Sequence, residues 1–156
     1  MQQETVGVPS ELDIPEVQGW QLDIIEMIKQ EPDSRSIIWV VYSEGARGKC
    51  LDLAKYLCIK HQAIFLGGAP SVMKYQIISH AKKMKGVAPE LIIMDISREQ
   101  RKVCYAGIAT IKHGCFATKR GTMFIMNSPH IVVFANRMPT PGIDFSADRL
   151  KIFAAD

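Results

Sequence analysis

The segment that decides the fold is IIWVVYSEGARGKC, which occupies residues 37–50. Its first part, residues 37–42, is a continuous apolar run, which is typical of a strand buried on both faces of a parallel sheet. A glycine-rich loop follows, and after it begins a helical pattern whose apolar face includes Leu53. A glycine-rich loop between a buried strand and a helix is a common phosphate-binding device, because backbone N–H groups and the helix N-terminus face the anion.

The loop departs from the usual phosphate-binding pattern at two positions. Ser43 stands where a glycine is expected six residues before Lys49, and Cys50 replaces the hydroxyl residue that normally follows the lysine. The missing hydroxyl is a hard oxygen ligand for Mg²⁺, whereas a thiol is soft. We therefore expect weakened use of Mg–ATP. The residues expected to bind the nucleotide are Gly45, Ala46, Arg47, Gly48, Lys49 and Cys50.

The composition predicts one globular domain and excludes several other classes. The chain has 156 residues, of which 47% are hydrophobic and 22% charged, which is ordinary for a globular domain. A net charge of +3 is too small to predict nucleic-acid binding by itself. The four cysteines form no C-x-x-C pair, which argues against a zinc site or a disulfide framework. Scattered cysteines of this kind are expected to be reduced thiols of an intracellular protein. No apolar stretch is long enough to cross a membrane, so we expect no membrane partner.

The order of the elements predicts an α/β fold. Residues 1–16 show no periodicity and are expected to be a flexible lead-in to a domain at residues 17–156. Helices and strands alternate, so we expect a mainly parallel sheet with helices on both faces. The expected helices lie at residues 17–30, about 50–60, 71–84 and 99–112. The expected strands lie at residues 37–42, 63–66, 91–94, 131–135 and 150–154, with a hairpin formed by residues 115–118 and 122–126.

Three of the expected strands end in residues suited to nucleotide chemistry. The loop up to Lys49 follows the first strand, while Asp95 and Asn136 follow two others. Ligands of open parallel sheets bind at the carboxyl ends of the strands. An acid there suits Mg²⁺ or the water that the ion orders, and an asparagine suits a phosphate oxygen or an attacking water. Each feature alone is also typical of an ordinary turn, but the three together favour a nucleotide site.

Several segments resemble the helicase domain of the replication-initiator (Rep) proteins of small circular single-stranded DNA viruses, the circovirus, nanovirus and CRESS-DNA group, and their integrated relatives. The segment PHIVVFAN at residues 129–136 is similar to the family's P-H-V-x-V-F-A-N almost letter for letter. Residues 105–116 resemble Y-x-x-I-E-x-I-K-x-G-x-F, with Ala109 in place of the usual Glu, and residues 146–152 resemble S-x-D-R-W-x-I. The resemblance covers about residues 17–153.

The resemblance implies a superfamily-three helicase of the AAA+ type, which is a P-loop NTPase that uses ATP and Mg²⁺. It implies that Lys49 holds the β- and γ-phosphates, Asp95 the magnesium ion and Asn136 the γ-phosphate. If the usual hydroxyl position is retained as a ligand, Cys50 joins Asp95 at the metal. Arg149 is the candidate finger that reaches the ATP of a neighbouring subunit in a ring, commonly a hexamer. The residues implied to grip single-stranded DNA are Lys112, Lys119 and Arg120.

The resemblance also implies work in rolling-circle replication within the host nucleus. No nuclease motif precedes Trp20, so we expect no nuclease domain in this chain. Three alternatives remain open: an RNA helicase of the same superfamily, a nucleotide- or nucleic-acid-binding remnant without turnover, and another phosphate-loop enzyme such as a nucleotide kinase. A preference for RNA over DNA would distinguish the RNA helicase from the DNA helicase. ATP turnover would distinguish either helicase from the remnant that only binds.

Overall fold

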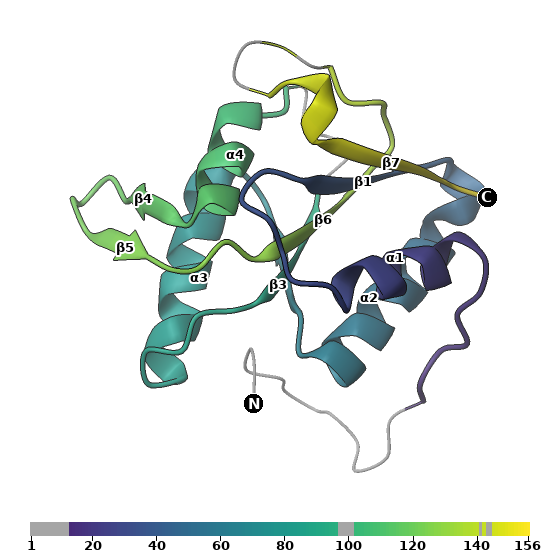
Figure 1. Cartoon of the computed structure of the whole chain (residues 1–156), viewed down its shortest axis with the longest axis horizontal. Helices are drawn as coiled ribbons and strands as arrows, with labels where there is room; N and C mark the ends of the chain where they lie inside the picture. The colour runs from purple at the N-terminus through teal and green to yellow at the C-terminus, as the bar shows by residue number, and fades with distance from the viewer. Residues whose placement is uncertain (1–12, 97–101, 141, 143–144) are drawn as a thin grey trace.

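The centre of the molecule is a five-stranded sheet in the order β2-β3-β6-β1-β7 (Figure 1). The structure is a computed structural model, and it describes residues 13–96, 102–140, 142 and 145–156. The strands are β1 (Ile37–Tyr42), β2 (Ile64–Gly67), β3 (Leu91–Asp95), β6 (His130–Ala135) and β7 (Leu150–Ala155). Each neighbouring pair runs parallel, so the predicted α/β fold with a parallel sheet is confirmed.

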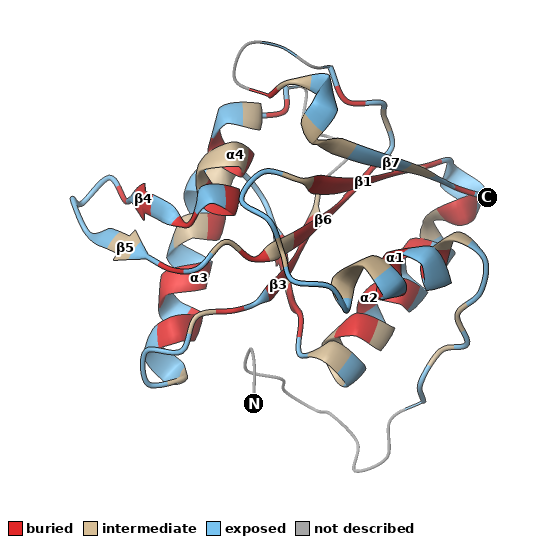
Figure 2. Cartoon of the chain, viewed as in Figure 1, coloured by how far each residue is buried: buried red, intermediate tan, exposed pale blue. Residues whose placement is uncertain are grey.

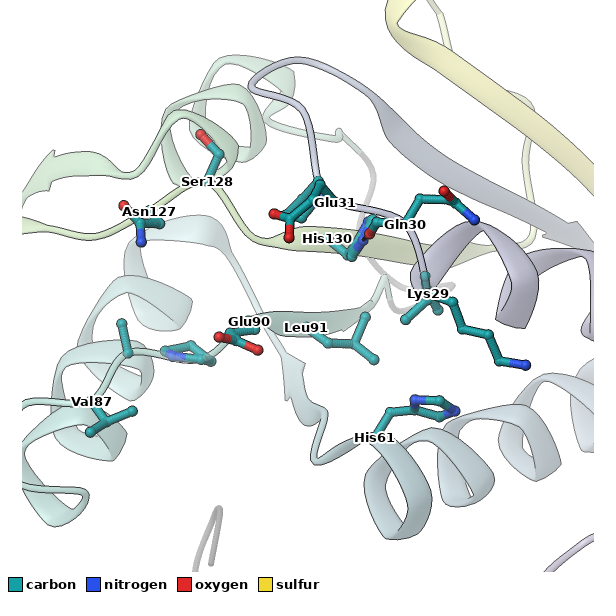
Figure 3. Close-up of a pocket in the computed structure, with 14 residues that line it drawn as sticks. Lys29, Gln30, Glu31, His61, Val87, Glu90, Leu91, Asn127, Ser128 and His130 are labelled. Carbon is teal, nitrogen blue, oxygen red and sulfur yellow. Dashed lines mark hydrogen bonds between the residues drawn. The ribbon is translucent and has the colours of Figure 1, made fainter.

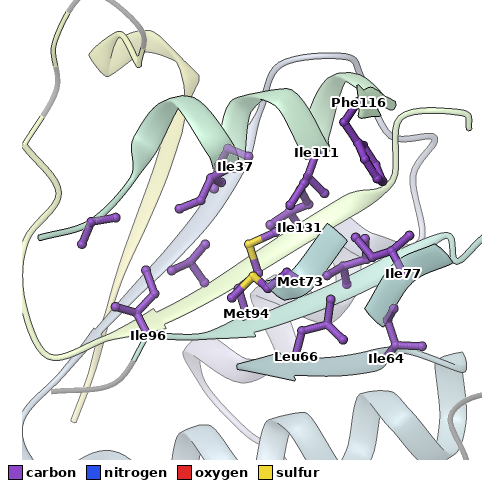
Figure 4. Packing of buried hydrophobic residues seen from close by; sticks show 14 of the residues in the cluster. Ile37, Ile64, Leu66, Met73, Ile77, Met94, Ile96, Ile111, Phe116 and Ile131 are labelled. Carbon is purple, nitrogen blue, oxygen red and sulfur yellow. The ribbon is translucent and has the colours of Figure 1, made fainter. Parts of the chain in front are cut away.

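Helices cover both faces of this sheet, as predicted. On one face lie α1 (Trp20–Ile28) and α2 (Arg47–His61), whose apolar residues form one buried cluster with the sheet. On the other face lie α3 (Pro70–Lys83) and α4 (Tyr105–His113), which close a second cluster (Figure 4). The sheet is therefore the middle layer of three.

The side chains of β1 supply both clusters, because successive residues of a strand point to opposite faces. Ile37 and Trp39 pack on the α3 and α4 side, whereas Ile38 and Val40 pack on the α1 and α2 side. All four are at most 4% exposed, and the sheet interior is the most continuously buried part of the chain (Figure 2). Burial on both faces explains why the sequence shows an unbroken apolar run instead of an alternating one.

The predicted hairpin is present and leaves the main sheet. Its strands, β4 (Cys115–Ala117) and β5 (Met123–Ile125), pair antiparallel and project beside α4 (Figure 1). Gly114 joins α4 to this hairpin with a φ of +87°, and a Cβ there would lie 2.2 Å from the carbonyl oxygen of Met126. Only glycine fits this joint without a change in the backbone.

The helices begin and end at slightly different residues from those predicted. Gly19 has a φ of +59°, which is outside the helical region, so α1 begins at Trp20 and not at residue 17. The predicted helix at residues 99–112 is observed only as α4, which begins at Tyr105, because residues 102–104 are not helical. Residues 99–101 lie outside the described residues, as do residues 1–12 of the predicted lead-in. Of the helices in the described part of the chain, none combines the length and the apolarity that a membrane span needs.

Candidate nucleotide-binding site

The sheet brings the three predicted strand ends to one edge. Strands β3, β6 and β1 are neighbours in that order, and parallel strands end on the same side. Asp95 is the last residue of β3, Asn136 directly follows β6, and the loop that leads to Lys49 follows β1. The strand order therefore makes this edge the candidate nucleotide site.

The loop after β1 is a tight turn. Residues Glu44–Ala46 form a 3₁₀ turn in which the N–H of Ala46 donates to the carbonyl of Ser43 at 3.0 Å, and α2 begins at Arg47. The N-cap residue of α2 is Ala46, whose side chain makes no capping hydrogen bond to the first backbone N–H groups of the helix. Such a helix start favours an anion through its N–H groups and its dipole.

The side chain of Arg47 covers the predicted metal ligand. Its Nη2 donates to Oδ2 of Asp95 at 2.8 Å, and its Nη1 donates to Oδ1 at 3.1 Å, which is a bidentate ion pair. Nη1 also donates to the hydroxyl of Tyr42 at 2.8 Å, and the guanidinium carbon lies 5.4 Å from the centroid of the Tyr42 ring. The pair is partly buried, with 33% of the arginine side chain and 21% of the aspartate side chain exposed. The hydrogen bonds to Asp95 raise the pKa of Arg47, so the guanidinium remains charged.

Lys49 points away from the Arg47 pair in this structure. Its Nζ donates to the backbone oxygen of Asp156, beyond the end of β7, and its own carbonyl accepts from Nε2 of Gln21 at 2.8 Å. The predicted contact of Lys49 with the β- and γ-phosphates therefore requires the ammonium group to leave the Asp156 oxygen.

Cys50 is fully buried in the cluster between α1, α2 and the sheet. Burial, with a smaller contribution from the charge of Asp95, raises the pKa of this thiol to about 12, although Arg47 opposes the shift. The thiol is therefore protonated at neutral pH and has no open path to a metal ion. This placement differs from the metal-ligand role expected for Cys50, because the side chain packs into the core.

The donor set as a whole does not fit Mg²⁺. The ion needs several hard oxygen ligands in near-octahedral geometry. Both oxygens of Asp95 accept hydrogen bonds from Arg47, and Cys50 offers only a neutral thiol. In the part of the chain that the structure describes, no group of three or more His, Cys, Asp or Glu side chains could hold a metal ion.

Asn136 and Arg149 lie at opposite edges of the sheet. Asn136 is exposed at the carboxyl edge, where the turn after β6 is fixed by a 3.0 Å bond from Nε1 of Trp39 to the carbonyl of Arg137. Arg149 directly precedes β7 at the amino edge, where its Nε donates to the carbonyl of Arg35 at 3.1 Å. Arg149 is therefore on the far side of its own sheet from the loop, and a role at a nucleotide requires a neighbouring subunit.

The three residues expected to bind nucleic acid do not lie together. Lys119 and Arg120 are exposed at the turn between β4 and β5. Lys112 lies in α4 with 1% of its side chain exposed, and its Nζ donates to the carbonyl of Pro129 at 2.6 Å and lies 3.9 Å from Oδ1 of Asp33. Burial lowers the pKa of Lys112 to about 8. The expectation for Lys112 is therefore corrected, because its ammonium group is held inside the protein.

Sequence reasoning missed two features of the structure. Tyr42 was assigned only to a strand, although its position as the last residue of β1 was a usable signal for a place beside the site. A polar pocket of about 500 Å³ also lies at the amino edge of the sheet (Figure 3), where His130 shares a 2.7 Å hydrogen bond with the carbonyl of Gln30. His61 and Glu90 line the same pocket, and no spacing in the sequence relates these residues.

Comparison with known proteins finds relatives among the Para-Rep proteins of alphasatellites. The chain is 33% identical over 145 residues to Para-Rep C3 of Milk vetch dwarf C3 alphasatellite, which covers 88% of this chain and 47% of that protein. It is 29% identical over 142 residues to Para-Rep C6 of Subterranean clover stunt C6 alphasatellite, and this match covers 88% of this chain and 47% of that protein. It is 33% identical over 142 residues to Para-Rep C1 of Faba bean necrotic yellows C1 alphasatellite, and this match covers 88% of this chain and 48% of that protein.

The chain thus spans about half the length of the curated relatives that it matches. No protein-family model matches it, and no solved structure gives a significant match. The likeness to Rep-type proteins that the motifs predicted is therefore confirmed, whereas the narrower likeness to their helicase domain stays a prediction.

Proposed function

We propose, from this likeness to the Para-Rep proteins, that the chain is the nucleotide-binding, helicase-type domain of a Rep-like protein that acts in rolling-circle replication of a small circular single-stranded DNA genome. The observation that carries the proposal is the edge of the sheet at which the start of α2, Asp95 and Asn136 all lie. A crevice outside the carboxyl ends of parallel strands is where such folds bind nucleotides.

In this proposal the residues of the edge divide the work. The first N–H groups of α2 and the ammonium group of Lys49 bind the phosphates of ATP, after Lys49 has left the Asp156 oxygen. Asn136 is exposed at the end of β6 and holds the terminal phosphate or orients the attacking water. Since the donor set does not fit Mg²⁺, no step is assigned to that ion.

The remaining site residues act outside the nucleotide edge. Lys119 and Arg120, exposed at the hairpin turn, contact the backbone of single-stranded DNA. Arg149 reaches the nucleotide of a neighbouring subunit in a homo-oligomeric ring, proposed as a hexamer. This replication takes place in the nucleus of a host cell. Single-stranded RNA is the alternative strand, and the same exposed cations would contact its backbone.

A second candidate function is nucleotide or nucleic-acid binding without turnover. The contact that favours it is the bidentate pair in which Arg47 occupies both oxygens of Asp95. In this second candidate the fold and the phosphate contacts persist, but the Asp95 carboxylate is bound to Arg47 and does not organise the attacking water.

The test is ATP binding and hydrolysis by the purified chain, with and without single-stranded DNA or RNA. Lys49→Ala is the test variant, and Lys55→Ala is its matched control, since Lys55 is an exposed lysine of the same helix. Turnover that increases with DNA and disappears only in Lys49→Ala supports the helicase-type function. ATP binding without turnover supports the second candidate, and absence of ATP binding contradicts the helicase-type function.

A further inference from the structure

The guanidinium of Arg47 stands where a cation is expected beside the strand-end carboxylate. Three of its five N–H groups donate to Asp95 and Tyr42, at 2.8, 3.1 and 2.8 Å. The planar group is thereby fixed by the last residues of two strands, β1 and β3. One N–H on Nη2 and the N–H on Nε take no part in these bonds, so they remain as donors toward a further acceptor.

A guanidinium can perform part of the electrostatic work of a divalent cation. A metal ion between a strand-end carboxylate and a bound nucleotide neutralises both partners and joins them. An arginine bound bidentately to a carboxylate neutralises that carboxylate in the same place, and its spare N–H groups donate to phosphate oxygens. Arg47 is also the first residue of α2, which puts its charge beside the N–H groups at the start of that helix.

We propose that Arg47 takes the place of the divalent cation, so that this site binds the phosphates of a nucleoside triphosphate without a metal ion. The inference rests on the proposed nucleotide site and adds the chemical form of its ligand, a metal-free triphosphate. Two separate facts support it: both oxygens of Asp95 are already bound to the cationic guanidinium of Arg47, and the thiol of Cys50 is buried in the core and supplies no hard oxygen ligand.

The alternative is that Mg²⁺ displaces Arg47 when the nucleotide binds. The ion would then have to break a bidentate, partly buried pair and leave the charged guanidinium without its carboxylate. The residue after Lys49 would not help to hold the ion, because Cys50 carries a thiol buried in the core instead of a hydroxyl. The two alternatives predict opposite effects of removing Mg²⁺.

The test is calorimetric titration of the full chain with ATP, in Mg²⁺ and again in EDTA, with inorganic triphosphate as a probe of the phosphate contacts alone. We expect the dissociation constant of ATP to change by less than about threefold when Mg²⁺ is removed. We expect Arg47→Gln to weaken metal-free binding by about tenfold or more, since hydrogen bonds from a charged donor to phosphate are lost, and to make binding depend on Mg²⁺.

Two further variants keep the test decisive. Arg35→Gln breaks a second bidentate arginine–aspartate pair, between Arg35 and Asp148 on the exposed surface, and should leave ATP affinity unchanged in both buffers. Arg47→Lys keeps the positive charge but loses the planar guanidinium that donates two parallel hydrogen bonds, so it should bind metal-free ATP more weakly than the wild type. This variant tests the inference even if Arg47→Gln fails to fold.

Each outcome has one meaning. Similar affinity in Mg²⁺ and EDTA, lost in Arg47→Gln, supports the inference. Binding that requires Mg²⁺ in the wild type, or metal-free binding that both Arg47 variants leave intact, overturns it while the proposed nucleotide site stands. Absence of ATP and triphosphate binding under both conditions overturns the proposed function and the inference with it.

Discussion

Replacing Gly114 by alanine should push the hairpin away from the end of α4 and greatly lower the free energy of unfolding. The left-handed backbone of Gly114, with a φ of +87°, costs an alanine about 1–2 kcal/mol. The added Cβ would also lie 2.2 Å from the carbonyl oxygen of Met126, which is backbone and has to move. That movement strains the 2.8 Å bond from the N–H of Met126 to the carbonyl of Gly114 and adds about 2 kcal/mol or more.

Gly121→Ala is the matched control for this prediction. Gly121 has a similar φ of +85° in the hairpin turn, but an added Cβ would meet no atom within 4 Å. Only the backbone cost of about 1–2 kcal/mol applies there. Thermal unfolding followed by circular dichroism should therefore show a midpoint loss of about 10 °C for Gly114→Ala and about 4 °C for Gly121→Ala. Equal losses would refute the close packing of the hairpin strand against the end of α4.

Three other changes test the site and its surroundings. Burial lowers the pKa of Lys112 from 10.5 to about 8, so the cost of its buried charge is fully present below pH 8 and disappears as the pH rises toward 10.5. The buried thiol of Cys50 titrates in both proteins, so urea unfolding should show the free energy of unfolding of the wild type rising by up to about 3 kcal/mol relative to that of Lys112→Met across this window. If the hairpin binds single-stranded DNA, Lys119→Gln with Arg120→Gln should reduce the slope of log affinity against log salt by about 1.4, and an unchanged slope would exclude both contacts. Iodoacetamide should alkylate the exposed Cys115 in the native protein and leave the buried Cys50 intact until it unfolds, as peptide mass spectrometry would show.

The sequence predicted the sheet well because its strands are buried on both faces. Continuous apolar runs such as residues 37–42 and 131–135 have only one stable environment in a fold with alternating helices, which is the inside of a parallel sheet. Their expected ends agree with β1 and β6 to within one residue. The meeting of Asp95 and Asn136 at one edge followed from the same topology, because it depends only on the direction of the strands.

The side-chain pairing at the site could not be predicted in the same way. The contact between Arg47 and Asp95 joins the start of α2 to the end of β3. The strand that leads to α2 is β1, which β6 separates from β3 in the sheet, and no periodicity reports such a pair. Lys112 is a different case, since it follows the buried Ile108 by four positions and so shares its helical face. The resemblance to a DNA-binding hairpin was the only basis for the expected DNA contact of Lys112, and its helical face is the buried one.

The position of β1 between β6 and β7 determines when the domain is able to fold. Both neighbours of β1 come later in the chain, and Arg35 and Asp148, which join the starts of β1 and β7, are 113 residues apart in sequence. Contacts of such long range form slowly, because a large loop must close before they form. During synthesis the segment IIWVVY therefore emerges long before its partners and exposes two unpaired strand edges. Nascent or truncated chains can therefore associate with one another through this segment. Chains that lack β7 should aggregate more readily than the full chain.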